Sequence, residues 1–373
     1  MMTRLHKAVL AAAFAALLLS SCAKVETLSP RVLIGFQVGR SASQTKASMG
    51  GSLIDESCSS FWCNAWYTPT AGSVQRFMDT DEVVPDETPG VNVWAPVRDY
   101  FWPHTGTINF FSYASARPLG NKLSVTNNGS TFTITNYTVT SADNILVADA
   151  VYNATRTNAN ASLEPAGEND PTGVPALFRH VLASVAMDMM LKTTAQKATV
   201  NTTYEVIVTN VTLHNFRDQG SLTLTNTYSG GSAYGTQAWT PASDGTQVGW
   251  VPTGTAHDVD LTPDSQSSIV LDAGETESDD VIFLGRGAVM PQSLEGTLSI
   301  SITLTIRSKH GATIYNEDKD VVLSASLDPA PGAAWKMNQK IHYHIEIDPV
   351  TTTLRFDPAV GEWDVVNGGT IQL

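Results

Sequence analysis

The chain has 373 residues, of which 42% are hydrophobic, and a formal net charge of −14 at pH 7. A chain of this length can bury more than one core, so about two domains are expected. The acidic balance and the lack of a basic cluster argue against nucleic acid or an anionic membrane surface as a partner.

The first residues have the pattern of an export signal. Arg4 and Lys7 precede an apolar run at residues 8–19, which has the length of a signal-peptide core and is too short for a confident membrane span. Residues 19–22, Leu-Ser-Ser-Cys, then have the spacing of a lipobox. We therefore expect residues 1–21 to be a signal peptide and Cys22 to be lipidated and to become the new N-terminus.

Residues 31–40 are predicted to form a strand that could be removed. Alternate apolar residues fall on one face at the two-residue period of a strand, namely Val32, Ile34, Phe36 and Val38. The segment ends at Arg40, and the small polar residues 41–47 that follow are expected to form an exposed loop. A protease could cut this loop after folding. The alternative is a permanent first strand that follows a lipid anchor.

The other two cysteines leave their redox state open. Cys58 and Cys63 enclose four residues, and an exported chain would meet an oxidising compartment. A disulfide that closes so short a loop is geometrically constrained, so Cys58–Cys63 is only a candidate disulfide. No second cysteine pair or histidine pair has the spacing of a zinc site, so no metal is predicted here.

The mature chain has the composition of an all-β protein. Short runs rich in Thr, Val, Ile, Tyr and Phe are separated by Gly, Asn, Pro, Asp and Ser. Asn128-Gly129 between two such runs predicts a hairpin. Many evenly spaced strands without intervening helices favour β-sandwiches. The clearest alternating runs are residues 108–113, 131–134, 204–213, 298–306 and 341–347.

Two stretches interrupt this pattern and suggest the domain limits. Residues 155–173 lack any apolar period and are expected to form a linker. Residues 175–191 fit both a helical and a strand period, so a short helical turn leading into a strand is expected. Residues 229–264 are expected to form a long loop or an irregular hairpin. The predicted parts are residues 1–21, 22–40, 41–172 and 173–373.

The search for catalytic and metal-binding motifs finds none with the required spacing. There is no phosphate-binding glycine loop, no nucleophile elbow and no His-Glu-x-x-His zinc motif. His342 and His344 would share one strand face, but without a third ligand in the sequence a solvated face is the better interpretation. The sequence therefore predicts no enzyme, no cofactor and no metal.

Short motifs at residues 19–22, 100–103, 108–114 and 177–185, with others along the chain, together resemble the fimbrillin family of the Bacteroidetes, whose members are pilin-type lipoproteins. The motifs follow one another over nearly the whole chain. The Tyr-Phe-Trp-Pro motif with the strand after it, and the segment around Phe178 and His180, contribute most. The matching segments are residues 19–22, 34–36, 45–47, 94–96, 100–103, 108–114, 177–185, 335–338, 343–347, 356–358 and Trp363.

The resemblance implies a fold and a mechanism. It implies two β-sandwich domains in tandem, the second transthyretin-like, behind a lipid on Cys22 in the outer membrane. A trypsin-like, Arg-specific protease would cut after Arg40 and release the first strand. A donor strand from another copy, or from a related pilin, would then fill the groove. On this pattern the donor would come from the C-terminal region, with alternating residues such as Leu354 and Phe356, or Trp363 and Val365 followed by Ile371 and Leu373.

Three functions remain open from the sequence. The first is a structural pilin that polymerises by strand exchange into surface fimbriae for adhesion, with a host or glycan receptor. The second is an accessory tip or anchor pilin. The third is a surface glycan-binding lipoprotein that acts alone and uses exposed Trp239 or Trp250 to stack on sugars.

Overall fold

Alternating apolar and polar residues place most of the described chain in β-strands. The computed structural model describes residues 31–40, 58–85, 94–126, 131–159, 173–193, 202–226, 233–241, 249–263, 267–294, 298–327 and 334–362. These ranges contain no α-helix, and η1 (Gly120–Lys122) is their one 3-10 turn. The all-β prediction is confirmed. None of the described helical structure is long and apolar enough to cross a membrane.

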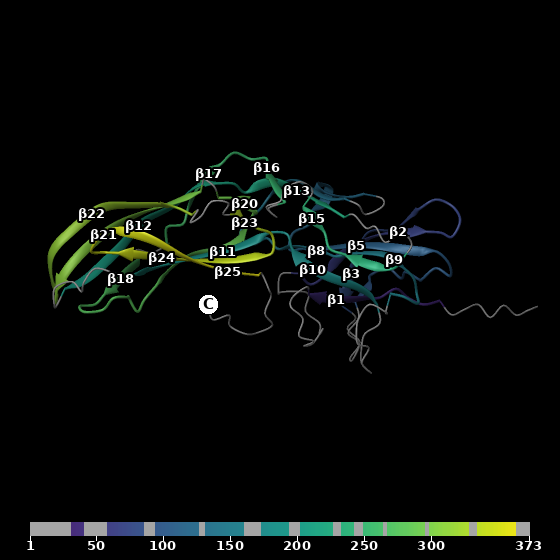
Figure 1. Ribbon diagram of the computed structural model, residues 1–373, viewed down its shortest axis with the longest axis horizontal. Coiled ribbons are helices and arrows are strands. Elements are labelled where there is room, and N and C mark those ends of the chain that lie inside the picture. The colour runs from purple at the N-terminus through teal and green to yellow at the C-terminus, as the bar shows by residue number, and fades with distance from the viewer. Residues whose placement is uncertain are drawn as a thin grey trace, which may run out of the picture. The chain divides into compact units, whose positions relative to one another are not determined.

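Seven strands of the first half close into a barrel (Figure 1). The order around it is β5-β2-β3-β4-β1-β10-β8, and β8 pairs with β5 to complete the ring. The sequence predicts a β-sandwich here, but β5 pairs with β2 on one edge and with β8 on the other, which closes the sheet. The barrel strands are β1 (Phe36–Arg40), β2 (Phe61–Thr68), β3 (Gln75–Pro85), β4 (Trp94–Pro96), β5 (Thr107–Ser115), β8 (Ile145–Ala148) and β10 (Val174–His180).

Strands that follow residue 172 in the chain pair with strands that precede it. β9 (Ala150–Ala154) pairs with β5 and with β14 (Gly235–Gln237). A second sheet has the order β15-β13-β7-β6, with β16 also paired to β13. Its strands are β6 (Leu123–Val125), β7 (Thr131–Thr138), β13 (Gln219–Thr225), β15 (Thr240–Pro241) and β16 (Trp250–Pro252). The boundary between residues 172 and 173 therefore does not separate the sheets, and the domain limits stay a prediction.

The expected hairpin around Asn128-Gly129 fits the pairing of its two arms. β6 and β7 pair antiparallel, with Leu123 opposite Ile134 and Val125 opposite Phe132. The turn itself, residues 127–130, lies outside the described residues. The two flanking strands thus adopt the arrangement that the alternating runs predict.

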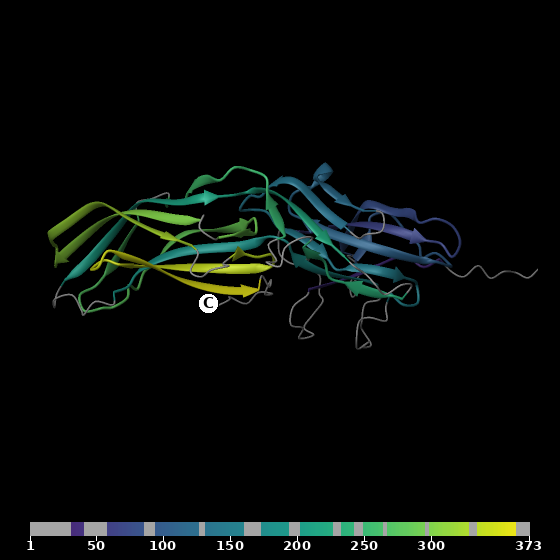
Figure 2. The same ribbon diagram turned by 45° about the horizontal axis from the view of Figure 1, so that its top comes forward.

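The remaining strands form two sheets around one shared core. One sheet has the order β19-β11-β24-β25, and the other has the order β17-β12-β21-β22 with β18 on β12. Figure 2 shows the yellow β24 and β25 alongside the teal β11, to which β24 is parallel. Val185, Ile302 and Ile345 are among the buried residues that meet between the sheets. The strands are β11 (Ala183–Leu191), β12 (Thr203–Phe216), β17 (His257–Asp260), β18 (Ser267–Leu271), β19 (Ile282–Val289), β21 (Ser299–His310), β22 (Thr313–Ser326), β24 (Gln339–Asp348), β25 (Thr353–Glu362) and the separate pair β20 (Gln292–Ser293) and β23 (Ala334–Trp335).

The helical turn expected within residues 175–191 is not present. The segment consists of β10 and β11, joined by Val181 and Leu182. Nearly every residue of both strands is buried, because each strand has packed neighbours on both faces. A strand buried on both faces has a near-continuous apolar sequence, and its periodicity cannot be told from that of a buried helix.

Candidate functional site

β1 lies between β10 and β4, and it pairs with more residues of β10 than of β4. It pairs in parallel with β10 over five residue pairs, from Phe36 opposite Val174 to Arg40 opposite Phe178. On the other side it pairs antiparallel with β4 through the single pair of Phe36 and Trp94. Figure 1 shows β1 beside β10. Without β1, the facing edges of β4 and β10 would lose this partner and the ring would be open.

The apolar face of the first segment points into the barrel. Ile34 is 2% exposed and Phe36 is fully buried, while Val38 is partly buried against the same core. The ring of Phe36 makes edge-to-face contacts with Phe61 at 5.4 Å and Phe110 at 5.5 Å between centroids. Such aromatic pairs add about 0.5–1.5 kcal/mol each beyond the area they bury.

The other residues of the predicted face lie nearer the surface. Val32 is half-buried, and Leu33 beside it is 55% exposed. The alternation predicted for residues 32–38 is therefore present in the structure and is strongest at its centre. That this strand is displaced stays a prediction.

Gln37 is a buried polar residue within β1. Its side chain is 2% exposed, although it lies on the opposite face of the strand from Phe36. Neither its amide nitrogen nor its amide oxygen has a hydrogen-bond partner among the described residues. A buried amide without a partner costs free energy, so Gln37 makes β1 less stable in its place than an apolar residue would.

Two backbone contacts position the start of β1. The Ile34 N–H donates to the Tyr100 carbonyl, and the Val174 N–H donates to the Gly35 carbonyl, both at 2.8 Å. A Cβ on Gly173 would lie 3.0 Å from the Gly35 oxygen and from the Phe36 carbonyl carbon. Glycine at 173 therefore allows β1 to approach β10 closely, a role that the sequence analysis missed because Gly173 stands at the end of a predicted linker.

The Tyr-Phe-Trp-Pro motif has a structural role beside this strand. The Tyr100 hydroxyl donates to Asp81 Oδ2 at 2.7 Å, and burial and this hydrogen bond raise the pKa of Tyr100 to about 12. Trp102 packs edge-to-face on Phe110 at 5.9 Å between centroids. Tyr100 and Trp102 of the motif therefore pack against the core cluster that contains Ile34 and Phe36.

The predicted cleavage and lipidation residues lie at or beyond the limit of the described chain. Arg40 is the last residue of β1, and its backbone is paired opposite Phe178. The loop expected to be cut, at residues 41–47, lies outside the described residues, and so does Cys22. A protease that cuts after Arg40 must bind the end of a paired strand, so cleavage requires the last residues of β1 to separate from β10.

The candidate disulfide is not formed in the structure. Cys58 and Cys63 are both buried in the barrel core, and no disulfide joins them. Burial raises the pKa of the Cys63 thiol to about 12, which keeps it protonated and unreactive at neutral pH. Both cysteines act here as small apolar core residues.

The two tryptophans of the glycan hypothesis are packing residues. Trp250 is 2% exposed, and its Nε1 donates to the Val181 carbonyl at 2.7 Å. Trp239 is half-buried, donates from Nε1 to the Ala148 carbonyl at 2.8 Å, and packs its ring against Phe111. Both rings therefore contribute to packing, and glycan binding through Trp239 or Trp250 stays a prediction.

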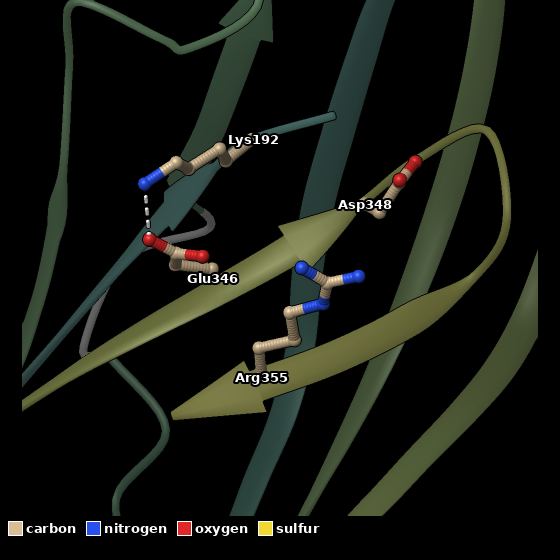
Figure 3. A pocket seen from close by; sticks show the side chains of 4 residues that line it. All are labelled: Lys192, Glu346, Asp348 and Arg355. Atoms are coloured by element: carbon tan, nitrogen blue, oxygen red, sulfur yellow. Dashed lines mark hydrogen bonds and ion pairs between the residues drawn. The ribbon is translucent and has the colours of Figure 1, made fainter. Parts of the chain in front are cut away.

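A small pocket between β24 and β25 is lined by charged residues (Figure 3). Lys192 Nζ pairs with Glu346 Oε1 at 2.6 Å. Asp348 accepts hydrogen bonds from Thr193 Oγ1 and from the backbone N–H groups of Val350 and Thr351. These contacts are typical of a tight turn and an ion pair, so the pocket is structural.

Comparisons with known proteins agree with this architecture. A family model described as "Fimbrillin-like" matches residues 60–363, a region that begins after β1. No curated protein matches the chain in sequence. A crystal structure of a fimbrial protein from Bacteroides vulgatus is similar to it, with 14% identity, a TM-score of 0.52, and coverage of 90% of this chain and 100% of that one. A candidate cell adhesion protein from Parabacteroides distasonis is similar at 11% identity and a TM-score of 0.47, covering 91% of this chain and 98% of that one.

Proposed function

The chain belongs to the fimbrillin-like family, and from this we propose that it is a structural subunit of surface fimbriae. In this proposal it is exported as a lipoprotein, is anchored in the outer membrane through Cys22, is cut after Arg40, and polymerises by donor-strand exchange. Its partners are further copies or related pilins, a trypsin-like Arg-specific protease, and a host or glycan receptor. No enzymatic activity, cofactor or nucleic acid is assigned, and the second sheet pair is proposed to be a transthyretin-like domain.

The observation that supports this proposal most is the position of β1. It is a short strand near the N-terminus inside a closed barrel, it ends at an arginine, and within the described residues its two neighbours do not pair with each other. Removing it would expose unpaired N–H and C=O groups on β4 and β10. A donor strand would restore both ladders, as in other cases of β-strand addition.

The energetic consequence of losing β1 is a substantial fraction of the stability of a domain. A fully buried Ile or Phe side chain contributes about 1.5–3 kcal/mol by leaving water, and this is an upper estimate. Ile34 and Phe36 would leave their two sites empty together. A protein domain is stable by only about 5–15 kcal/mol, so an emptied barrel favours a strand whose apolar side chains fill the same sites.

The donor strand is proposed to come from residues beyond β25. Leu354 and Phe356, one of the two options that the sequence offered, pack against the core between the two sheets of the second half. β25 also pairs with β24 over its whole length, from Gln339 opposite Glu362 to Asp348 opposite Thr353. They are therefore closing-strand residues. The other option, residues after Trp363, lies outside the described residues.

Limited trypsin digestion of the purified precursor tests the proposal. We expect a new N-terminus at Ser41, followed by a ladder of multimers that dissociate slowly in SDS. Arg40→Ala should stay monomeric under the same conditions. Arg31→Ala is the matched control, because a cut there would leave β1 attached, and it should polymerise like the wild-type chain.

Two results would count against parts of the proposal. Cleavage after Arg40 without multimers would exclude a self-polymerising stalk subunit and favour an accessory tip or anchor pilin. A chain that trypsin leaves uncut at Arg40, and that stays solitary, would exclude strand exchange through β1.

A further inference from the structure

Three side chains that could bind a metal meet where β11 and β24 lie side by side. The register places Asp188 of β11 directly opposite His344 of β24, and His342 is two residues away on the same face. This face is opposite the apolar core, because the intervening residues Met187 and Tyr343 belong to the core cluster. The sequence showed the two histidines but not the third ligand, which is more than 150 residues away.

The distances bring one carboxylate within reach of both imidazoles. Asp188 Oδ2 lies 2.7 Å from His342 Nε2, and Asp188 Oδ1 lies 2.8 Å from His344 Nδ1. The two imidazole centroids are 4.2 Å apart. One ligand atom from each of the three residues lies within 4.8 Å of the others. The side chains are 11%, 17% and 33% exposed for Asp188, His342 and His344 in turn, so solvent reaches the site from the His344 side.

A hydrogen bond does not account for the contact of His342. Its Nε2 is buried and has no hydrogen-bond partner of acceptable geometry among the described residues, although the carboxylate oxygen is 2.7 Å away. An N–H at this position does not meet the geometry of a hydrogen bond to the oxygen, and an unprotonated Nε2 would face the oxygen with no proton between them. A cation bound by both atoms would remove this conflict.

A local irregularity in β19 lies beside the carboxylate. The pairing of β11 with β19 shifts register between Met187 and Asp188, so that Leu284 is an extra residue on β19. Gly285 in this bulge has a φ of +150°, which favours glycine. Bulges re-aim side chains and often lie beside functional sites. Here the bulge lies at the residue that supplies the third ligand.

We propose that Asp188, His342 and His344 form a binding site for a first-row divalent transition cation such as Zn²⁺. Two imidazole nitrogens and one carboxylate oxygen are a ligand set that suits Zn²⁺ rather than Ca²⁺ or Mg²⁺, which take oxygen ligands. Tetrahedral ligands at the usual Zn²⁺ distances lie roughly 3.3 Å apart. This spacing lies between the two short His–Asp distances and the 4.8 Å within which all three ligand atoms fall, so side-chain adjustments would bring them into place. A water would complete the coordination from the exposed side. Bound metal would tie β11 to β24 in the middle of their sheet.

Another His–Asp pair of the chain provides a matched control. His214 Nδ1 lies 2.9 Å from Asp258 Oδ2, with a geometry similar to that of His344 and Asp188. Among the described residues, however, only the cluster of Asp188, His342 and His344 brings possible ligand atoms of three residues together. His214→Gln therefore removes a histidine and an ion pair without touching the proposed site.

Isothermal titration calorimetry with ZnCl₂ on the EDTA-treated and dialysed chain tests the proposal. We expect one Zn²⁺ per chain and a thermal midpoint that rises with Zn²⁺ and falls again with EDTA. His342→Gln, His344→Gln and Asp188→Asn should each weaken Zn²⁺ binding at least about tenfold, because even outer-shell partners of metal sites cost 10–100-fold. His214→Gln should bind Zn²⁺ like the wild-type chain.

Thermal melts without metal show whether each variant folds, and a visible spectrum of the Co²⁺-loaded wild-type chain gives a second measurement that needs no variant. Intense d–d bands that disappear when Zn²⁺ displaces Co²⁺ would support the site. The proposal is overturned if the wild-type chain shows no saturable binding and no such bands. It is also overturned if His214→Gln weakens binding as much as His344→Gln does.

Discussion

Gln37 is the residue at which the sequence of β1 departs from that of an ideal buried strand. Its neighbours Phe36 and Val38 pack into the barrel, but its own amide is buried without a hydrogen-bond partner among the described residues. An unsatisfied buried amide costs about 1–3 kcal/mol. On the strand-exchange proposal this cost is useful, because a donor strand with an apolar residue at this position would bind more tightly than β1 does.

Replacing Gln37 by Leu should therefore stabilise the uncut chain. We expect Gln37→Leu to raise the free energy of unfolding by about 1–3 kcal/mol, measured by urea denaturation. Gln75→Leu, at an exposed position of β3, should change it by less than about 0.5 kcal/mol. A lower free energy for Gln37→Leu would mean that the amide makes hydrogen bonds in solution.

At the scale of elements, Asp143 joins three strands of the first half. It precedes β8 and accepts hydrogen bonds from Arg117 after β5, from the Tyr137 hydroxyl of β7 and from the Thr140 N–H. Burial alone would raise the pKa of Asp143, but the hydrogen bonds from Arg117 and Thr140 outweigh it and lower this pKa below its usual value of 3.8. The ionised carboxylate therefore stabilises the closure of the barrel by β8.

The lowered pKa gives a stability difference that depends on pH. The folded carboxyl group is more acidic than the unfolded one, so its contribution is complete above the unfolded pKa and is lost as the pH falls through the folded pKa. Asp143→Asn should lower the free energy of unfolding by about 1–2 kcal/mol at pH 7, since Arg117 is partly exposed, and by less at pH 3 and below.

Urea denaturation at pH 7, 5 and 3 would show this convergence. Asp279→Asn, at an exposed position, is the control and should follow the wild-type chain within about 0.5 kcal/mol at every pH. A constant difference between Asp143→Asn and the wild-type chain from pH 7 to pH 3 would show that the carboxylate charge is not what stabilises this connection.

At the scale of the whole molecule, the closed ring would keep the uncut chain a monomer on the strand-exchange proposal. β1 fills the ring position between β4 and β10. Because β1 is parallel to β10 and antiparallel to β4, an incoming strand of either direction would meet one parallel and one antiparallel edge. The backbone edges would supply the hydrogen bonds, and the apolar spacing of the incoming side chains would select the partner.

A synthetic peptide of residues 31–40 should compete for this position after trypsin cleavage. We expect excess peptide to reduce the multimers seen by size-exclusion chromatography and to bind the cut monomer. A peptide with Phe36→Asp should not compete, because a charge would enter a fully buried site. Multimers that form equally well with the wild-type peptide would place the polymer interface elsewhere.

Local pattern was sufficient for much of this protein. The two-residue period predicted the β-strands and the apolar face of residues 32–38. It also predicted the alternating burial of residues 298–306 and 341–347. A strand with one buried face alternates apolar and polar residues, so the sequence shows which face is buried. It could not distinguish strand from helix in residues 175–191, where both faces of the segment are buried.

The tertiary structure decided which strands meet. Closure of the barrel, the parallel pairing of β1 with β10, the burial of Trp250, and the meeting of Asp188 with His344 each join residues that lie far apart in the chain. Periodicity reports only that a residue faces a core or solvent, whereas these contacts depend on which edge pairs with which. The sequence therefore determined the faces of the strands, and the folding of the whole chain determined their partners.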